Sequence, residues 1–240
     1  MAVTTDVIRI MTSGTFAAAL FGLIPQLERY AKKRIVTLTT SIGIGESFIP
    51  NRLRRGEIAD IVIVADEVLC QCIEDGLVLQ DGYTQLVRSV IGMAVRAGTP
   101  EPDISSLQAL KSTLLRATSI GYSASVSGHY LVTDLCQRLG IVDLLKQKGR
   151  LIGDERVGTV VARGEVEIGF EQLSELIPVP GIGYIKPLPL EAQKVSTFSA
   201  GVAASSPDAA LARAAIKFLA SSDATKAITD SGLQPIRNCS

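Results

Sequence analysis

The chain has 240 residues and a mass of 25.4 kDa, which is enough for one or two domains with a proper hydrophobic core. Hydrophobic residues make up 47% and charged residues 20%, a composition that excludes a disordered chain and a coiled coil. Basic and acidic residues number 24 each, so the zero net charge favours neither a nucleic-acid partner nor a polybasic attachment to a membrane.

The first part of the chain alternates predicted strands and helices. Apolar runs predict strands over residues 7–11, 34–39 and 60–65. Helical spacing predicts a helix from residue 16 to residue 31, and further helices over 48–55 and 67–75, the last ended by Gly76. Pro25 is expected to break the first of these helices and to start a second piece. This β-α-β-α-β order implies parallel strands in an α/β sheet.

A strand over 90–95 and an irregular stretch over 96–102 predict a crossing into a second half with the same logic. The expected helices of that half cover 106–115, 128–139 and 157–163, its expected strands cover 119–121 and 168–170, and a Pro-rich stretch over 178–189 ends it. A strand over 195–204 and helices over 208–220 and 223–230 close the chain. We therefore expect two α/β lobes, residues 1–95 plus 195–240 and residues 96–194, with a ligand cleft between them.

The N-terminus and the cysteines bear on whether the chain is a secreted, a membrane-spanning or a metal-binding protein. No basic segment leads into an apolar one, so no signal peptide is visible, and no run of 18 apolar residues occurs. The chain as given is thus expected to be cytoplasmic, or periplasmic where a leader has been removed, without membrane insertion. The four cysteines lack the spacing of a metal site, and we expect small buried apolar side chains, with Cys239 in a loose tail.

Three strand-to-helix loops, over 12–15, 39–47 and 121–130, share hydroxyl-rich, glycine-containing sequences. Ordinary helix capping explains each loop alone. Their recurrence favours a shared anion site, because hydroxyls and N–H groups at helix N-termini bind negative charge. The candidate binding residues are Ser13, Thr15, Ser41, Ser125 and Ser127, and the ionisable candidates are Glu46 and His129. Arg156, next to Glu155, is a candidate for a bidentate carboxylate pair, and the strand end at 170–172 is a further candidate.

Five segments carry a family resemblance that covers nearly the whole chain: residues 10–16, 55–63, 104–111, 119–121 and 163–170. In them the sequence resembles the type II periplasmic binding proteins, and among these the molybdate-binding branch. The resemblance implies two α/β lobes with a hinged ligand cleft. In the molybdate receptors neutral hydroxyls and backbone N–H groups hold the oxyanion, and Ser13 falls at the first such position.

The sequence departs from that branch at ionisable residues. The loop expected to read Ser-Ser-Gly is altered and contains Glu46, and a carboxylate close to a doubly charged oxyanion is repulsive. His129 and Arg156 are also ionisable where neutral groups would serve. These departures favour a larger organic acid. The sequence is also similar to the aconitate isomerases, enzymes on this scaffold that need no cofactor.

Two main hypotheses follow. In the first, the chain is a cofactor-independent isomerase that moves a double bond in an unsaturated polycarboxylate of the aconitate type by proton transfer. The five hydroxyl residues and Arg156 would bind carboxylates, and His129 or Glu46 would transfer the proton. In the alternative, the same loops bind molybdate, another oxyanion or an organic acid without turnover, and the chain is a receptor that feeds an ABC permease. A third hypothesis is a sensor domain that needs a partner chain.

Overall fold

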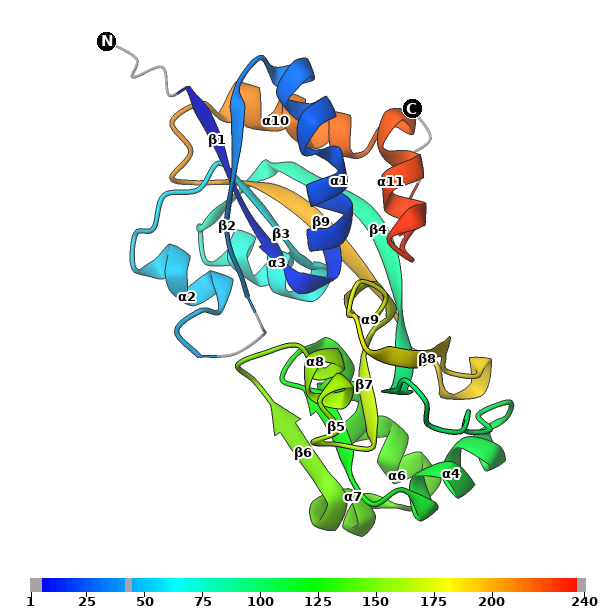
Figure 1. The fold of residues 1–240 in the computed structure, drawn as a ribbon. Coiled ribbons are helices and arrows are strands. Elements are labelled where there is room, and N and C mark those ends of the chain that lie inside the picture. The colour runs from blue at the N-terminus through cyan, green and yellow to red at the C-terminus, as the bar shows by residue number, and fades with distance from the viewer. Residues whose placement is uncertain (1–5, 42–44, 237–240) are drawn as a thin grey trace. The chain divides into compact units, whose positions relative to one another are not determined.

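The computed structural model describes residues 6–41 and 45–236, and the side chains of residues 39–41 are outside that description. The chain forms two compact units (Figure 1): unit 1 comprises Met1–Ser89 and Ser196–Ser240, and unit 2 comprises Val90–Val195. The chain passes between the units within β4 (Val78–Arg96) and at the start of β9 (Val195–Ala203). In the described ranges, no helix is long and apolar enough to span a membrane.

Unit 1 is built on a sheet that begins with three parallel strands. β1 (Val7–Ser13) lies between β2 (Arg34–Ser41) and β3 (Ile61–Ala65), and β9 pairs antiparallel with β3. β4 follows β9 in the strand order, and β10 (Gln234–Pro235) pairs antiparallel with β4. The parallel pairing of β1, β2 and β3 confirms the prediction from the β-α-β order. Their carboxyl ends lie at one edge, where α1 and α3 begin.

The helices of unit 1 cover this sheet with apolar stripes. They are α1 (Gly14–Ala31), α2 (Ile49–Arg54), α3 (Asp66–Glu74), α10 (Ala209–Leu219), the short η3 (Ser222–Ala224) and α11 (Thr225–Asp230). α1 packs against α10 and α11 (Figure 1), and its residues Phe16, Leu20, Leu23 and Leu27 are fully buried. These four residues follow the helical spacing seen in the sequence.

The prediction that Pro25 breaks the first helix is wrong, because α1 runs unbroken through it. Pro25 has no N–H group to donate to the carbonyl of Phe21, but both residues lie on the exposed face, where water can bind that carbonyl. The buried stripe continues on both sides, from Leu20 to Leu27. Tertiary packing therefore outweighs the local preference of proline.

Unit 2 contains a second sheet region of mixed direction. β5 (Ile120–Ser123) pairs in parallel with β6 (Gly149–Ile152) and with β7 (Ile168–Gln172), while the second part of β4 pairs antiparallel with β7 and with β8 (Ile182–Pro187). The sequence pattern did not predict β6, β8 or the first part of β4. Most residues of β6 and β8 are exposed or half-buried, so neither strand has the apolar run that marks a buried strand.

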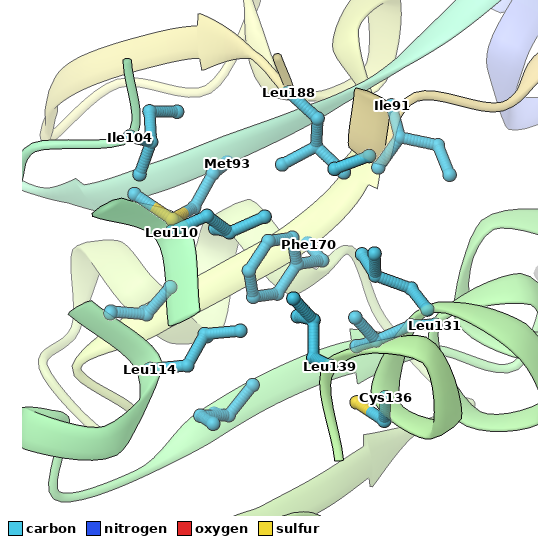
Figure 2. Close-up of a cluster of buried hydrophobic side chains, with 14 of the residues drawn as sticks. Ile91, Met93, Ile104, Leu110, Leu114, Leu131, Cys136, Leu139, Phe170 and Leu188 are labelled. Carbon is cyan, nitrogen blue, oxygen red and sulfur yellow. The ribbon is translucent and has the colours of Figure 1, made fainter. Parts of the chain in front are cut away.

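The helices of unit 2 enclose its core. They are α4 (Leu107–Arg116), α5 (Val126–Tyr130), the π-helical η1 (Leu131–Leu135), α6 (Cys136–Leu139), α7 (Val142–Lys148), α8 (Val157–Ala162), α9 (Leu173–Leu176) and the 3-10 turn η2 (Leu190–Ala192). The helix expected over 128–139 therefore begins two residues earlier and contains a π segment. Figure 2 shows Phe170 of β7 among Met93, Leu110, Leu131 and Leu139, all of them buried.

Two of the three described cysteines are buried, as small apolar side chains are expected to be. Cys72 and Cys136 are free and buried, as expected, and burial raises the pKa of each thiol to about 11. The expectation is wrong for Cys70, which is exposed, because residues two apart on α3 point to different sides and only Cys72 faces the core. Cys239 lies outside the described residues.

Candidate functional site

Three serine hydroxyls meet where β5 passes into α5 in unit 2. The Oγ atoms of Ser123 and Ser125 are 2.7 Å apart, those of Ser123 and Ser127 3.0 Å, and those of Ser125 and Ser127 3.2 Å. Ser123 and Ser127 are buried and Ser125 is half-buried. Because a hydroxyl hydrogen rotates freely, these three donors can turn toward a bound anion. We call these residues the serine cluster.

The backbone of the loop is arranged to bring these hydroxyls together. Ser125 is the N-cap residue of α5, yet its side chain makes no capping hydrogen bond. A Cβ on Gly128 would lie 1.7 Å from the carbonyl oxygen of Ser123, so only glycine permits this approach of α5 to the end of β5. Ser125 and Ser127 were predicted binding residues, and the structure brings them together. Ser123 lies in the same predicted loop but was not among the predicted binding residues.

The N-terminus of α1 presents a second group of anion-binding donors, in unit 1. Ser13 is its N-cap residue, with an extended backbone and no capping side-chain bond, and the first turn contains no acidic residue. The Ser13 hydroxyl oxygen is buried and has no hydrogen-bond partner among the described residues. Thr15, two residues on, is 3% exposed. An unpaired hydroxyl beside the N–H groups of an 18-residue helix is a suitable partner for a carboxylate.

The second hydroxyl-rich loop is only partly described. Ser41 ends β2 opposite Ser13 of β1, but its side chain lies outside the described residues. Glu46 lies in a turn before α2, and its side chain is exposed. Its backbone carbonyl accepts a 2.7 Å hydrogen bond from the Arg55 guanidinium, which holds this turn against the end of α2.

The two basic candidates of unit 2, His129 and Arg156, differ in their surroundings. His129 lies on α5, but its side chain is exposed and makes no hydrogen bond to the serine cluster in the described structure. Arg156 is the half-buried N-cap residue of α8 and forms no ion pair with a described residue. Glu155 is bound instead to Arg163 by two 2.7 Å hydrogen bonds, which lower the pKa of this carboxyl. Arg156 is therefore available to pair with an external carboxylate.

Glu171 of β7 is a buried carboxyl next to the serine cluster. The register of β5 and β7 pairs Tyr122 with Phe170, so the following residues, Ser123 and Glu171, are neighbours at the carboxyl ends of the two strands. Glu171 is 1% exposed. Glu171 lies in the strand end at 170–172 that the sequence marked as a further candidate, but it had no predicted role of its own.

The surroundings of Glu171 disfavour its charged form. Burial is the main cause, and the negative charge of Glu175 on α9 adds to it, so the pKa of Glu171 is raised well above its usual value. Backbone N–H groups of Val157 and Gly158 act in the opposite direction, the Gly158 bond being 3.4 Å long, and the effect of Arg156 is smaller still. Glu171 therefore keeps its proton to a higher pH than an ordinary glutamate.

A polar cluster that the sequence analysis missed lies in unit 1. The Asp66 Oδ1 atom accepts hydrogen bonds from the Tyr83 hydroxyl, at 2.6 Å, and from the Ser199 hydroxyl, at 2.5 Å. Burial and the hydrogen bond to Asp66 raise the pKa of Tyr83. The three residues come from α3, β4 and β9, and Asp66 directly follows the carboxyl end of β3. No local motif connects segments this far apart in the sequence.

Hydroxyl-bearing strand-to-helix loops in two α/β units are typical of the class of proteins that bind small anions. The family model described as bacterial extracellular solute-binding protein matches residues 8–234. The chain belongs to this family.

One relative and two solved structures extend this assignment. An aconitate isomerase from Pseudomonas sp. is 41% identical over 228 residues, which cover 95% of this chain and 87% of that protein. The periplasmic molybdate-binding protein of Azotobacter vinelandii matches with a TM-score of 0.74 and 18% identity, over 94% of this chain and 98% of that one. The sulfate-binding protein of Mycobacterium tuberculosis matches with a TM-score of 0.73 and 16% identity, over 96% and 87%. The two structures confirm the α/β fold of the binding proteins.

Proposed function

We propose that this chain is an isomerase that moves the double bond of an unsaturated polycarboxylate of the aconitate type by proton transfer. The observation that carries the proposal is the 41% identity to an aconitate isomerase over 95% of the chain. The same observation supports a small anion as the ligand, as do the molybdate- and sulfate-binding proteins of the same fold.

The donors described above support carboxylate binding within each unit. The serine cluster offers three rotatable hydroxyls, and Ser13 offers an unpaired one beside the N–H groups of α1. Arg156 supplies a half-buried guanidinium that forms no ion pair with a described residue. Neutral hydroxyl and N–H donors hydrogen-bond a carboxylate, and a guanidinium adds a stronger, charge-assisted pair. Thr15 and Ser41 remain candidates for further donors.

The reaction itself needs little besides positioning and a proton carrier. A base removes a proton from the methylene carbon next to the double bond, and the electron pair delocalises toward the carboxylates. A proton then returns to the carbon that was formerly part of the double bond, so the double bond has moved and no atom is gained or lost. Fixed donors that bind the carboxylates lower the free energy of the charged intermediate.

The deciding experiment is ultraviolet monitoring of the purified protein with trans-aconitate in deuterated water. We expect the spectrum to change as the cis isomer forms. Solvent deuterium in the product would show that the transferred proton exchanges with water during the reaction, and its absence would show direct transfer by a shielded group. An unchanged spectrum over a panel of unsaturated di- and tricarboxylic acids would remove the enzyme proposal. A heat-inactivated sample is the control for uncatalysed exchange.

The second candidate is a receptor that binds the same class of anion without turnover and feeds an ABC permease. The family match to extracellular solute-binding proteins and the likeness to molybdate- and sulfate-binding proteins favour it. A thermal-shift series with molybdate, sulfate, citrate and aconitate separates the candidates, because a ligand that binds the native state raises the melting temperature. Stabilisation by molybdate or sulfate, without turnover of aconitate, would favour the receptor.

A further inference from the structure

We infer that Glu171 is the catalytic acid–base that carries the proton between the two carbon atoms of the substrate, an inference that rests on the proposed function. Its carboxyl belongs to the carboxyl end of β7, beside Ser123 of β5. In α/β folds ligands bind outside the carboxyl ends of the strands. A substrate carboxylate bound by the serine cluster would therefore bring its reacting carbons next to this group.

The face of the sheet supports this placement. Side chains alternate along a strand, so Glu171 shares a face with Gly169, and Ser123 shares the same face with Gly121. A Cβ on Gly169 would lie 2.5 Å from the side chain of Val161, which shows that α8 covers that face closely. Glu171 is thus held in a dry position between α8 and the serine cluster, where a carboxyl can act on a carbon-bound proton without competition from water.

Glu171 also differs from Asp60, the other buried carboxyl group among the described residues, because it has no ion-paired partner there. Asp60, which is 3% exposed, accepts 2.8 Å hydrogen bonds from the Arg9 N–H and the Ser206 hydroxyl, and the Arg9 guanidinium is 3.9 Å away. Glu171 forms no ion pair in the described structure and accepts only backbone N–H groups. A glutamine would satisfy the same N–H groups without the cost of a buried charge. The ionisable group is therefore not required for packing.

The two ionisable groups expected from the sequence to carry the proton, His129 and Glu46, are both exposed. An exposed group is surrounded by water, which competes for the transferred proton. A carboxyl works best as a general base when its pKa lies close to the working pH, and burial together with the charge of Glu175 raises the pKa of Glu171 in that direction.

The proposed step is balanced. The Glu171 carboxylate accepts a proton from the substrate methylene group, so a C–H bond breaks and an O–H bond forms while the electron pair moves into the conjugated system. The neutral carboxyl then donates this proton to the other end of that system, so an O–H bond breaks and a C–H bond forms. Glu171 returns to its carboxylate form, and no oxidant, reductant or further reactant is consumed.

The first test compares wild type with Glu171→Gln in the trans-aconitate assay and in a calorimetric titration with trans-aconitate. We expect kcat to fall by about a thousandfold, the usual worth of a general base, while Kd changes by less than about threefold. A Glu171→Gln variant that keeps kcat within about tenfold, or one that loses binding and turnover together, would overturn the inference. If the wild-type protein has no activity, the proposed function fails. If the wild type is active but Glu171→Gln gives one of these contrary results, only the inference about Glu171 fails.

The second test is the pH profile, which needs no substitution at residue 171. Glu175 on α9 and Arg156 before α8 are the described groups whose charges act on Glu171. The exposed His129 lies on α5, and β4, which pairs with β7, contains Arg88 and Arg96. We expect kcat to rise with pH as Glu171 ionises, and Glu175→Gln to move the midpoint to lower pH because a like charge is removed. His129→Gln serves as the matched control and should leave the midpoint in place. A midpoint that moves with His129→Gln and not with Glu175→Gln would assign the proton to His129.

Discussion

The α-carbon of Gly128 lies directly against the carbonyl oxygen of Ser123, so that a Cβ at residue 128 would be 1.7 Å from that oxygen. This contact brings the first turn of α5 back against the last residue of β5. It is the reason that Ser125 and Ser127 reach the Ser123 hydroxyl, since the three residues otherwise belong to a loop and two separate elements.

Gly128→Ala should destabilise unit 2 and separate the serine cluster. The methyl group meets backbone, which cannot turn aside as a side chain can, so we expect a loss of at least about 2 kcal/mol in the free energy of unfolding. Urea denaturation measures it. Gly22→Ala is the matched control: residue 22 is exposed on α1, its Cβ would make an ordinary 3.6 Å contact, and the change should stabilise by about 0.5–1 kcal/mol. Equal effects of the two substitutions would contradict the proposed strain.

Ser127→Ala should weaken anion binding more than folding. Its hydroxyl bonds other serine hydroxyls and not a helix end, so a thermal-shift titration with trans-aconitate should give about a tenfold loss of affinity, the worth of one hydrogen bond to a charged group. Ser106→Ala is the opposite case, because Ser106 caps α4 through a 3.1 Å bond from the Ala109 N–H. That change should cost about 1 kcal/mol of stability and leave affinity unchanged. The reverse pattern would exclude the serine cluster from binding.

Ser13→Ala should leave the ligand-free protein as stable as before, within about 0.5 kcal/mol. The Ser13 oxygen is buried without a described partner and makes no capping bond, so its removal breaks no internal hydrogen bond. Binding of trans-aconitate should nevertheless weaken by about tenfold. Paired urea melts with and without trans-aconitate separate the two effects, and a stability loss that is equal in both would show a purely structural hydroxyl.

Glu171→Gln should stabilise the protein at high pH and not at low pH. The pKa of Glu171 is raised in the folded state, chiefly by burial, so between its ordinary value of 4.5 and the raised value the folded state holds a proton that the unfolded state has lost. Stability therefore falls as pH rises through that window and levels off above it, whereas below pH 4.5 both states are protonated. Urea denaturation of wild type and variant at pH 4 and pH 8 tests this. A variant that is equally stabilised at both values would show that charge is not the cause.

The features that could be predicted from the sequence are those encoded by residues close together in the chain. The apolar spacing from Phe16 to Leu27 marks one face of α1, and the β-α-β order implied the parallel pairing of β1, β2 and β3. The hydroxyl-rich composition of the loop over 121–130 was enough to predict Ser125 and Ser127 as binding residues. Strands such as β8 were not predicted because their exposed residues form no apolar run. The predicted break at Pro25 was wrong because the free-energy cost of a proline in a helix depends on whether it lies on the exposed or the buried face.

By itself, the sequence determined the two-part α/β organisation and the hydroxyl-rich loops, since helix periodicity and loop composition are local properties. Only the tertiary structure decided which ionisable groups have unusual chemistry. Nothing local in the sequence distinguishes Glu171 from Glu46. In the structure, Glu171 is 1% exposed beneath α8, whereas Glu46 is exposed to water. The free energy of a charge depends on the atoms and solvent around it, and those are brought there by segments distant in the chain.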